Sequence, residues 1–398
     1  MEIAYREIEG RSGAYWLLLA VLAAVTAAGL AGAWAMEHHG HIVTGMTNQI
    51  VWGMPHVVAV FLIVAASGAL NVASVASVFG KDFYKPLAPL SGLLAIALLA
   101  GGLAVLMLDL GRADRLVVAM TRYNFTSIFA LNVFLYTGFF AVVALYLWTM
   151  MERRMNRYAK PVGYAAFVWR LVLTTGTGSI FGFLVARQAY DSAMLAPMFI
   201  AMSFSYGLAV YLAVLIAAYA WSGRELDAAM LRRLKNLLIV MIAAVLYFVA
   251  VFHLTNLYFA RQVAFERFVL ADGGIYPALF WGGQMVLGSL VPMAMLAHPR
   301  LGAARGTVVA ASLLVILGGL AQMYVTIIGG QAFPLELFPG VEATSSFFDG
   351  RIHPYAPSLP EFALGLAGIA IAGMIVVLAV KLLRFLPERL DARLGESS

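Results

Sequence analysis

The placement of the charged residues constrains this chain more than any other feature. Asp, Glu, Lys and Arg make up 12% of the residues, against about a quarter in typical soluble domains, and they gather in short clusters between apolar runs. Each run has roughly 20–27 residues, which is enough for a helix to cross a hydrocarbon core of about 30 Å. Because lipid offers the backbone no hydrogen-bond partner, and no alternating strand pattern of a barrel is present, we predict an all-α polytopic membrane protein. A buried helical enzyme would need far more polar surface.

The apolar runs predict about ten transmembrane helices in one integral membrane domain, residues 1–398, without a linker or soluble domain. The first run follows a polar N-terminal segment and is long, so we expect it to be a retained span rather than a cleaved signal. The predicted spans are 14–36, 52–79, 88–108, 125–150, 162–185, 196–221, 236–260, 276–297, 306–329 and 361–383.

The basic residues predict the orientation of these spans. If the N-terminus is cytoplasmic, the cytoplasmic segments carry 18 of the 26 lysines and arginines, the outer loops carry seven, and Arg170 lies inside a span. Positive charge concentrates in this way on the cytoplasmic side of membrane proteins. Both termini are therefore expected in the cytoplasm. The positive net charge reflects this topology, and nucleic-acid binding is not implied.

The chain has no cysteine, which excludes disulfides, zinc thiolate sites and an iron–sulfur cluster held by this chain. Any metal centres of an electron-transfer reaction are therefore expected in partner proteins.

Polar residues inside a membrane are expensive and are functional candidates by default. With the predicted topology most of them fall in the outer half, where seven helices bring polar groups to one depth. An interfacial anchor or a helix cap is the alternative for each, and it is the better interpretation for Asn124 and Ser127. The candidates for a binding pocket or proton relay at this face are Trp52, His56, Asp109, Arg112, Asn124, Ser127, His253, Trp281 and Gln284.

Asp109 and Arg112 stand three residues apart at a helix end, where they could simply pair with each other. Yet Asp109-Leu-Gly-Arg112 followed by Asn124-x-x-Ser127 resembles the D-x-G-R…N-x-x-S signature of the NrfD/PsrC family of quinone-interacting membrane subunits. Further similar stretches are WG at Trp52, PMFIAMSFSYGLA from Pro197, FWGGQMVLGSLVPMAML from Phe280, IIGGQAFPLELFPG from Ile327 and PSLPEFALGLAG from Pro357. The ten-helix length and the last two of these stretches look most like the HybB-type branch, and within it the DsrP group of the Dsr complexes of sulfur metabolism.

The resemblance implies a quinone or quinol pocket near the outer face, beside a docked periplasmic ferredoxin-like iron–sulfur subunit, and no haem in this chain. The chain would be a non-autonomous subunit in the bacterial inner membrane, alongside other membrane and cytochrome subunits. The residues suit that chemistry, which moves two electrons and two protons. His56 could titrate near neutrality, Asp109 could relay protons, and Trp52 or Trp281 could stack on the ring. Neither the direction of electron flow nor the quinone, menaquinone or ubiquinone, is encoded.

Haem is the rival cofactor, but only His56 and His253 lie at matching depth for a bis-histidine site. The second class of function is proton translocation. Arg170 either reaches the cytoplasmic interface through its long stem or forms a proton path with Thr174 and Thr177. A further alternative is the membrane anchor of a nickel–iron hydrogenase.

The longest extramembrane piece, 331–360, contains five prolines together with Glu336, Glu342 and Asp349. A loop of this length is more often functional than idle. We expect it to dock a partner; a lid over its own bundle is the alternative.

Overall fold

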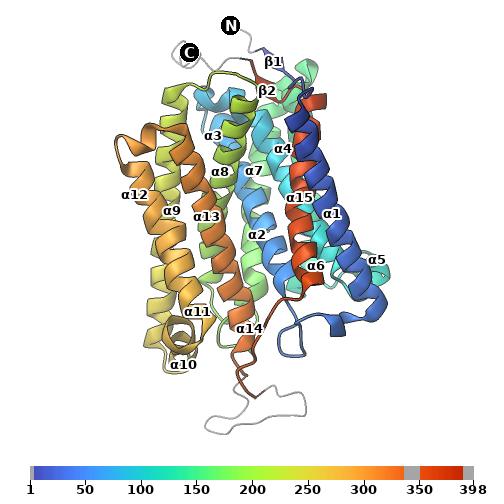
Figure 1. Ribbon diagram of the computed structural model, residues 1–398, viewed down its shortest axis with the longest axis vertical. Coiled ribbons are helices and arrows are strands. Elements are labelled where there is room, and N and C mark those ends of the chain that lie inside the picture. The colour runs from blue at the N-terminus through green and yellow to red at the C-terminus, as the bar shows by residue number, and fades with distance from the viewer. Residues whose placement is uncertain (1–3, 336–349, 389–398) are drawn as a thin grey trace.

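Long helices lie side by side along the long axis of the molecule (Figure 1). The computed structural model describes residues 4–335 and 350–388. Within those ranges, nine helices are long and apolar enough to cross a membrane, and the only strands are two residues long. The predicted all-α polytopic membrane fold is confirmed.

A helix lies at each of the ten predicted spans. In chain order these helices are α1 (Gly13–His39), α2 (Met54–Ala69) with α3 (Asn71–Ser77), α4 (Ala88–Leu108), α6 (Ile128–Met151), α7 (Ala159–Gly182), α8 (Leu195–Trp221), α9 (Ala228–Tyr258), α11 (Ile275–Pro277) with η6 (Ala278–Leu290) and α12 (Val291–Ala297), α13 (Arg305–Tyr324) with η8 (Val325–Gly329) and α14 (Gly330–Ala332), and α15 (Leu359–Leu382). The connecting turns are η1 (His41–Val43), η2 (Asp82–Leu87), η3 (Ala113–Arg115), α5 (Leu116–Thr121), η4 (Arg153–Tyr158), α10 (Val263–Arg267), η5 (Phe268–Asp272) and η7 (Leu301–Ala303).

Helices α9 and α7 differ from the apolar spans predicted at their positions. Helix α9 begins at Ala228, eight residues before the predicted start at 236, because Asp227 caps it by accepting a hydrogen bond from the Ala229 N–H. Helix α7 carries Arg170 and several glycines and threonines, and it is not among the nine apolar helices. It packs between α6 and α8, so its crossing of the membrane remains a prediction.

Helix α2 occupies the centre of the bundle and is buried along nearly its whole length among α4, α8, α13 and α15. It meets α8 at two glycines, Gly68 and Gly207, where a Cβ on either residue would overlap backbone atoms of the other helix. Small residues allow transmembrane helices to approach this closely. Helix α1 packs on α15 at the edge of the bundle and remains mostly exposed.

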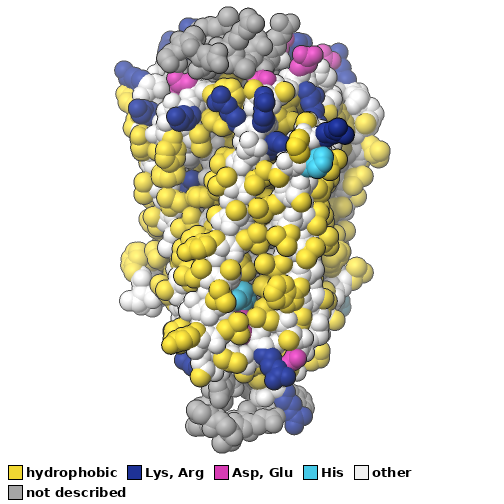
Figure 2. All heavy atoms as spheres, turned by 90° about the vertical axis from the view of Figure 1, so that its left-hand side faces the viewer, with side chains coloured by type: hydrophobic (Ala, Val, Ile, Leu, Met, Phe, Trp, Pro, Cys, Tyr) yellow, Lys and Arg dark blue, Asp and Glu magenta, His cyan; other side chains and the backbone are white. Residues whose placement is uncertain are grey.

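The two ends of the bundle differ in charge. We call the end that holds β1 (Tyr5–Arg6) and β2 (Leu386–Pro387) the terminal end, because both chain ends meet there (Figure 1). The two strands pair antiparallel, and the Arg224 guanidinium donates to carbonyl groups of both. Figure 2 shows lysines and arginines gathered toward this end, above a broad hydrophobic belt. We call the opposite end, where α2 and α15 begin, the distal end.

Candidate functional site

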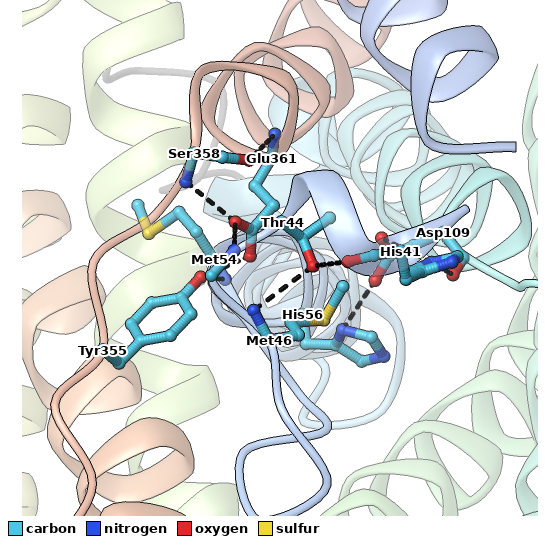
Figure 3. Close-up of polar contacts among 10 residues, drawn as sticks. His41, Thr44, Met46, Met54, His56, Asp109, Tyr355, Ser358 and Glu361 are labelled. Atoms are coloured by element: carbon cyan, nitrogen blue, oxygen red, sulfur yellow. Dashed lines mark hydrogen bonds and ion pairs between the residues drawn. The ribbon is translucent and has the colours of Figure 1, made fainter. Parts of the chain in front are cut away.

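At the distal end, two histidines surround one buried carboxylate (Figure 3). The Asp109 side chain is 1% exposed and follows directly after α4, while His56 lies in the first turn of α2. His56 Nδ1 is 2.9 Å from Asp109 Oδ2. His41 Nε2 is 3.9 Å from Asp109 Oδ1 and 3.0 Å from the Asp109 main-chain oxygen. The structure thus brings the two candidates His56 and Asp109 into contact and adds His41; their role stays a prediction.

This pair retains unused hydrogen-bonding capacity. Within the described residues, neither carboxylate oxygen of Asp109 nor Nδ1 of His56 makes an aligned hydrogen bond, despite the 2.9 Å approach of Nδ1 to Oδ2. Buried polar atoms without such a partner are rare and call for an explanation such as a ligand, water or catalysis. The His56 side chain is 20% exposed, so the pair is not sealed from outside molecules.

Aromatic rings line the same place. The Trp52 ring lies 6.4 Å from the His56 ring, measured between centroids, and also contacts Phe129 on α6 and Phe181 on α7. Such offset and edge-on contacts between aromatic rings are favourable. The structure thus places Trp52 beside His56, and its role in a binding pocket stays a prediction.

A second buried carboxylate holds the segment before α2 in position (Figure 3). Glu361, at the start of α15, accepts hydrogen bonds from the Gly45 N–H at 2.7 Å and the Tyr355 hydroxyl at 2.6 Å. It also forms a capping box with Ser358. Tyr355 in turn accepts from the Met54 N–H, and burial, followed by its hydrogen bond to Glu361, raises the pKa of Tyr355 above its ordinary value.

Gln331 fixes the same segment from another side. Its amide oxygen accepts from the N–H groups of Val51 and Trp52, and its amide nitrogen donates to the Trp52 carbonyl. Arg187 donates to the carbonyls of Gln331 and Gln49. The loop that presents Trp52 and His56 is therefore held by buried polar contacts to three distant parts of the sequence.

His253 belongs to a separate cluster. Its Nδ1 is 2.6 Å from Glu266 Oε2, and Asn256 donates to Glu266 Oε1 at 2.7 Å. Glu266 is fully buried. Gln284, buried on η6, lines a cavity with His253. His56 and His253, the pair weighed for haem, thus each face their own carboxylate.

The other four predicted pocket residues do not join either cluster. Arg112 is exposed and pairs with Asp114, at 2.9 Å between Nη2 and Oδ2, instead of with Asp109; hydrogen bonds from Arg112 lower the pKa of Asp114. The exposed Asn124 side chain accepts from Thr126 in a local turn. Ser127 is the residue before α6. Trp281 is half-exposed and donates to the Leu270 carbonyl.

Arg170 lies inside the bundle rather than reaching an interface, since only 2% of it is exposed. Its guanidinium sits over the rings of Phe167 and Phe204 and donates to the Ser67 carbonyl at 3.3 Å. Thr174 donates to the Ser67 hydroxyl at 2.6 Å.

Thr177 makes a different contact, with the Tyr136 hydroxyl at 3.3 Å. The predicted path residues are all buried, but Thr174 and Thr177 contact different partners.

Sequence reasoning passed over His41, Glu266, Gln331 and Tyr355 as site residues, and treated Glu361 only as the start of a span. Glu266 had a usable signal: it is a carboxylate thirteen residues after His253, between the apolar residues of the AF and FVL stretches. Within the described ranges, no three His, Asp or Glu side chains are arranged to hold a metal ion. Residues 336–349 of the long 331–360 loop, including Glu336, Glu342 and Asp349, lie outside the described residues.

Comparison with known proteins identifies the family. The family model described as "Polysulphide reductase, NrfD" matches residues 42–335. The chain is 30% identical to the Hdr-like menaquinol oxidoreductase integral membrane subunit of Archaeoglobus fulgidus, over 98% of both sequences. It is 29% identical to a putative dimethyl sulfoxide reductase membrane subunit of Halobacterium salinarum, over 95% of this sequence and 92% of the relative. It is 24% identical to a polysulfide reductase chain of Wolinella succinogenes, over 72% of this sequence and 96% of the relative. The protein belongs to the polysulphide reductase NrfD family of membrane proteins.

Proposed function

We propose that this chain is the quinone-exchanging membrane subunit of a multi-subunit oxidoreductase, and that the site is His56 and Asp109 beside Trp52. One observation carries the proposal: a buried carboxylate lies 2.9 Å from Nδ1 of an accessible imidazole, and among the described residues neither carboxylate oxygen nor Nδ1 makes an aligned hydrogen bond. A relative similar over 98% of both sequences is named as a menaquinol oxidoreductase subunit.

The residues present suit a quinone. Bound there, a quinone supplies two-electron, two-proton chemistry. An imidazole N–H of His56 would donate to a ring carbonyl, and the Asp109 carboxylate would accept from a ring hydroxyl. Both groups can hold a proton, so they can pass protons to and from the ring oxygens. Trp52 would offer an aromatic face.

We further propose that the electron partner docks at the distal end, as a periplasmic ferredoxin-like iron–sulfur protein contacting 110–123 and 331–360. The short distance between that end and the His56–Asp109 pair favours electron exchange there. The names of relatives, subunits of a dimethyl sulfoxide reductase and a polysulfide reductase, support a role in sulfur metabolism. The setting proposed is the inner membrane of a bacterium.

The test is quinol-coupled turnover of the purified complex with His56→Gln and Asp109→Asn. We expect each variant to lose at least about tenfold in turnover, since a positioned acid or base contributes about 10²–10⁴-fold, while assembly stays intact. Glu37→Gln, which removes an exposed carboxylate at the end of α1, is the matched control. Unchanged turnover in both site variants would place the quinone site elsewhere.

Proton translocation is the second candidate function, and buried Arg170 favours it. The described residues give its guanidinium a carbonyl and two rings but no carboxylate, an arrangement that costs stability and is retained mainly where charge has a role. We propose a path toward the terminal end through Arg170, Thr174 and Thr177. Arg170→Met should lower proton transfer across vesicles without changing quinone affinity; unaltered transfer would reject the path.

A further inference from the structure

Two small cavities lie inside the second half of the bundle, and Gln284 and Gln322 line both of them. The first, about 30 Å³, is lined by His253, Gln284, Gln322 and Thr326 among apolar side chains. The second, about 10 Å³, lies between Gln284 and Gln322 and polar groups deeper in the bundle. These volumes fit about two water molecules and about one. The amides of Gln284 and Gln322 line both cavities, so each glutamine can hydrogen-bond water on either side.

A buried carboxylate, Glu266, lies beside His253 on the distal side of these cavities. Glu266 is fully buried, and its described partners are His253 Nδ1 at 2.6 Å and the Asn256 amide at 2.7 Å. A buried carboxylate is costly unless a donor or a proton compensates it. A histidine and a glutamate in contact share protons as one coupled unit. The pair can therefore take up or release a proton inside the protein.

Polar groups continue from this pair toward the middle of the bundle. His253 lies near the distal end of α9, and Gln284 and Gln322 lie on η6 and α13. The Tyr206 hydroxyl donates to Gln322, and Ser289 donates to the Gln284 carbonyl. The helices turn π-helical at η6 and η8, which carry three of the cavity-lining polar residues, Gln284, Ser289 and Thr326. Such π segments occur frequently at functional sites.

The cluster is separate from the site at His56 and Asp109. Helix α2, which carries His56, packs against α8 and α13, and α9, which carries His253, packs on the other side of α8. We propose that His253 and Glu266 form a second proton-exchange centre, and that the two cavities carry protons between it and the bundle interior. This rests on the proposed function, because quinone chemistry at the first site would drive the transfer. Only protons move: one passes from water to the shared Nδ1–Oε2 pair.

The experiment uses the intact complex in sealed vesicles, with quinol or quinone as substrate, and measures turnover and protons translocated per electron. In Glu266→Gln, which keeps the side-chain shape, we expect turnover within about twofold of wild type and at least a halving of the proton ratio. Asp272→Asn is the matched control, because it removes an exposed carboxylate six residues away, paired to Arg267; both of its values should stay unchanged.

Three results would overturn the proposal. The first is an unchanged proton ratio in Glu266→Gln, and the second is a wild-type complex that releases only the protons of quinone chemistry itself. The third is a raised KM for the quinone in Glu266→Gln, which would make the cluster part of the binding site. If Glu266→Gln fails to assemble, His253→Asn decides by the same criteria. Failure of the proposed quinone site at His56 and Asp109 would be recognised separately, because turnover would then be unchanged in His56→Gln.

Discussion

Asp109 is a buried carboxylate whose neighbours are imidazoles rather than a guanidinium. A guanidinium stays protonated at every physiological pH and would hold the carboxylate ionised, whereas an imidazole titrates near neutrality. Because Arg112 turns outward to Asp114, Asp109 keeps a partner that can give and take a proton. The signature residue Arg112 therefore acts outside the pair, on the surface of the distal end.

His41 should contribute less than His56. Its ring lies 3.9 Å from the carboxylate and its side chain is 33% exposed, so it positions the end of α4 through the Asp109 carbonyl more than it exchanges protons. We expect His41→Ala to reduce turnover by less than tenfold, below the loss in His56→Gln, with the quinone KM affected more than kcat. Steady-state kinetics of the two variants will decide. A larger loss in His41→Ala would reverse the roles.

The loop between α1 and α2 carries Trp52 and leads into the first turn of α2, which carries His56. Contacts between this loop and the start of α15 hold the loop in position. Glu361 alone satisfies the Gly45 N–H, the Tyr355 hydroxyl and the Ser358 N–H. We expect Glu361→Ala to destabilise this contact by about 1–3 kcal/mol, because it removes the acceptor of three partly buried donors. Hydrogen exchange should rise over residues 45–54.

Glu361→Gln is the conservative comparison, since it keeps one acceptor oxygen and should show a smaller rise. Exchange that does not change in Glu361→Ala would mean that Gln331 and Arg187 hold the loop without Glu361.

The crossing of α2 and α8 depends on glycine. A methyl group on Gly68 would overlap the Ser203 carbonyl oxygen, so the helices must move apart. We expect Gly68→Ala to lower the stability of the protein by about 1–3 kcal/mol, measured as a lower midpoint of thermal unfolding in detergent.

Gly306→Ala is the matched control, because that helical glycine has open space around it. The substitution should be neutral or stabilising by up to about 1 kcal/mol. Equal loss in both variants would show that the effect does not come from the crossing of α2 and α8.

The positions of the helices could be predicted from the sequence because an apolar run between charge clusters leaves the backbone no other solution in lipid. Most helix ends lie within about three residues of the predicted ends. Helix α9 begins earlier than predicted because its first turns, with Arg232 and Arg233, are polar and precede the apolar run. The π-helical turns at η6 and η8 could not be predicted, since a shift in hydrogen-bond register leaves no hydrophobic signature.

At the scale of the whole molecule, polar residues predicted at the same depth in the membrane lie in different parts of the bundle. The sequence placed His56, Asp109 and His253 at one level of the membrane, and hydropathy carries no information about which helices are neighbours. The structure assigns them to clusters on different sides of α8. Glu266, the carboxylate partner of His253, lies in the connection after α9. That connection is outside the apolar spans in which the candidate residues were sought.

A protein without cysteine cannot hold an iron–sulfur cluster of its own, so its activity should depend on partners. We expect the protein, purified gently from its host, to carry an iron–sulfur protein, detected by mass spectrometry and by iron content. Recovery of a stable, active single subunit would contradict this. A nickel–iron hydrogenase large subunit among the partners would reject the sulfur role and favour the hydrogenase anchor.

The membrane orientation follows from charge and can be tested because the protein has no cysteine, which makes single-cysteine labelling clean. Basic residues gather toward the terminal end (Figure 2), and such loops stay on the cytoplasmic side. Glu225, at the terminal end after α8, and Ala271, at the distal end, are both exposed. A membrane-impermeant thiol reagent should therefore label Ala271→Cys in intact spheroplasts, and Glu225→Cys only after lysis. The opposite pattern would place the His56–Asp109 site on the cytoplasmic side and, with it, the partner that exchanges electrons there.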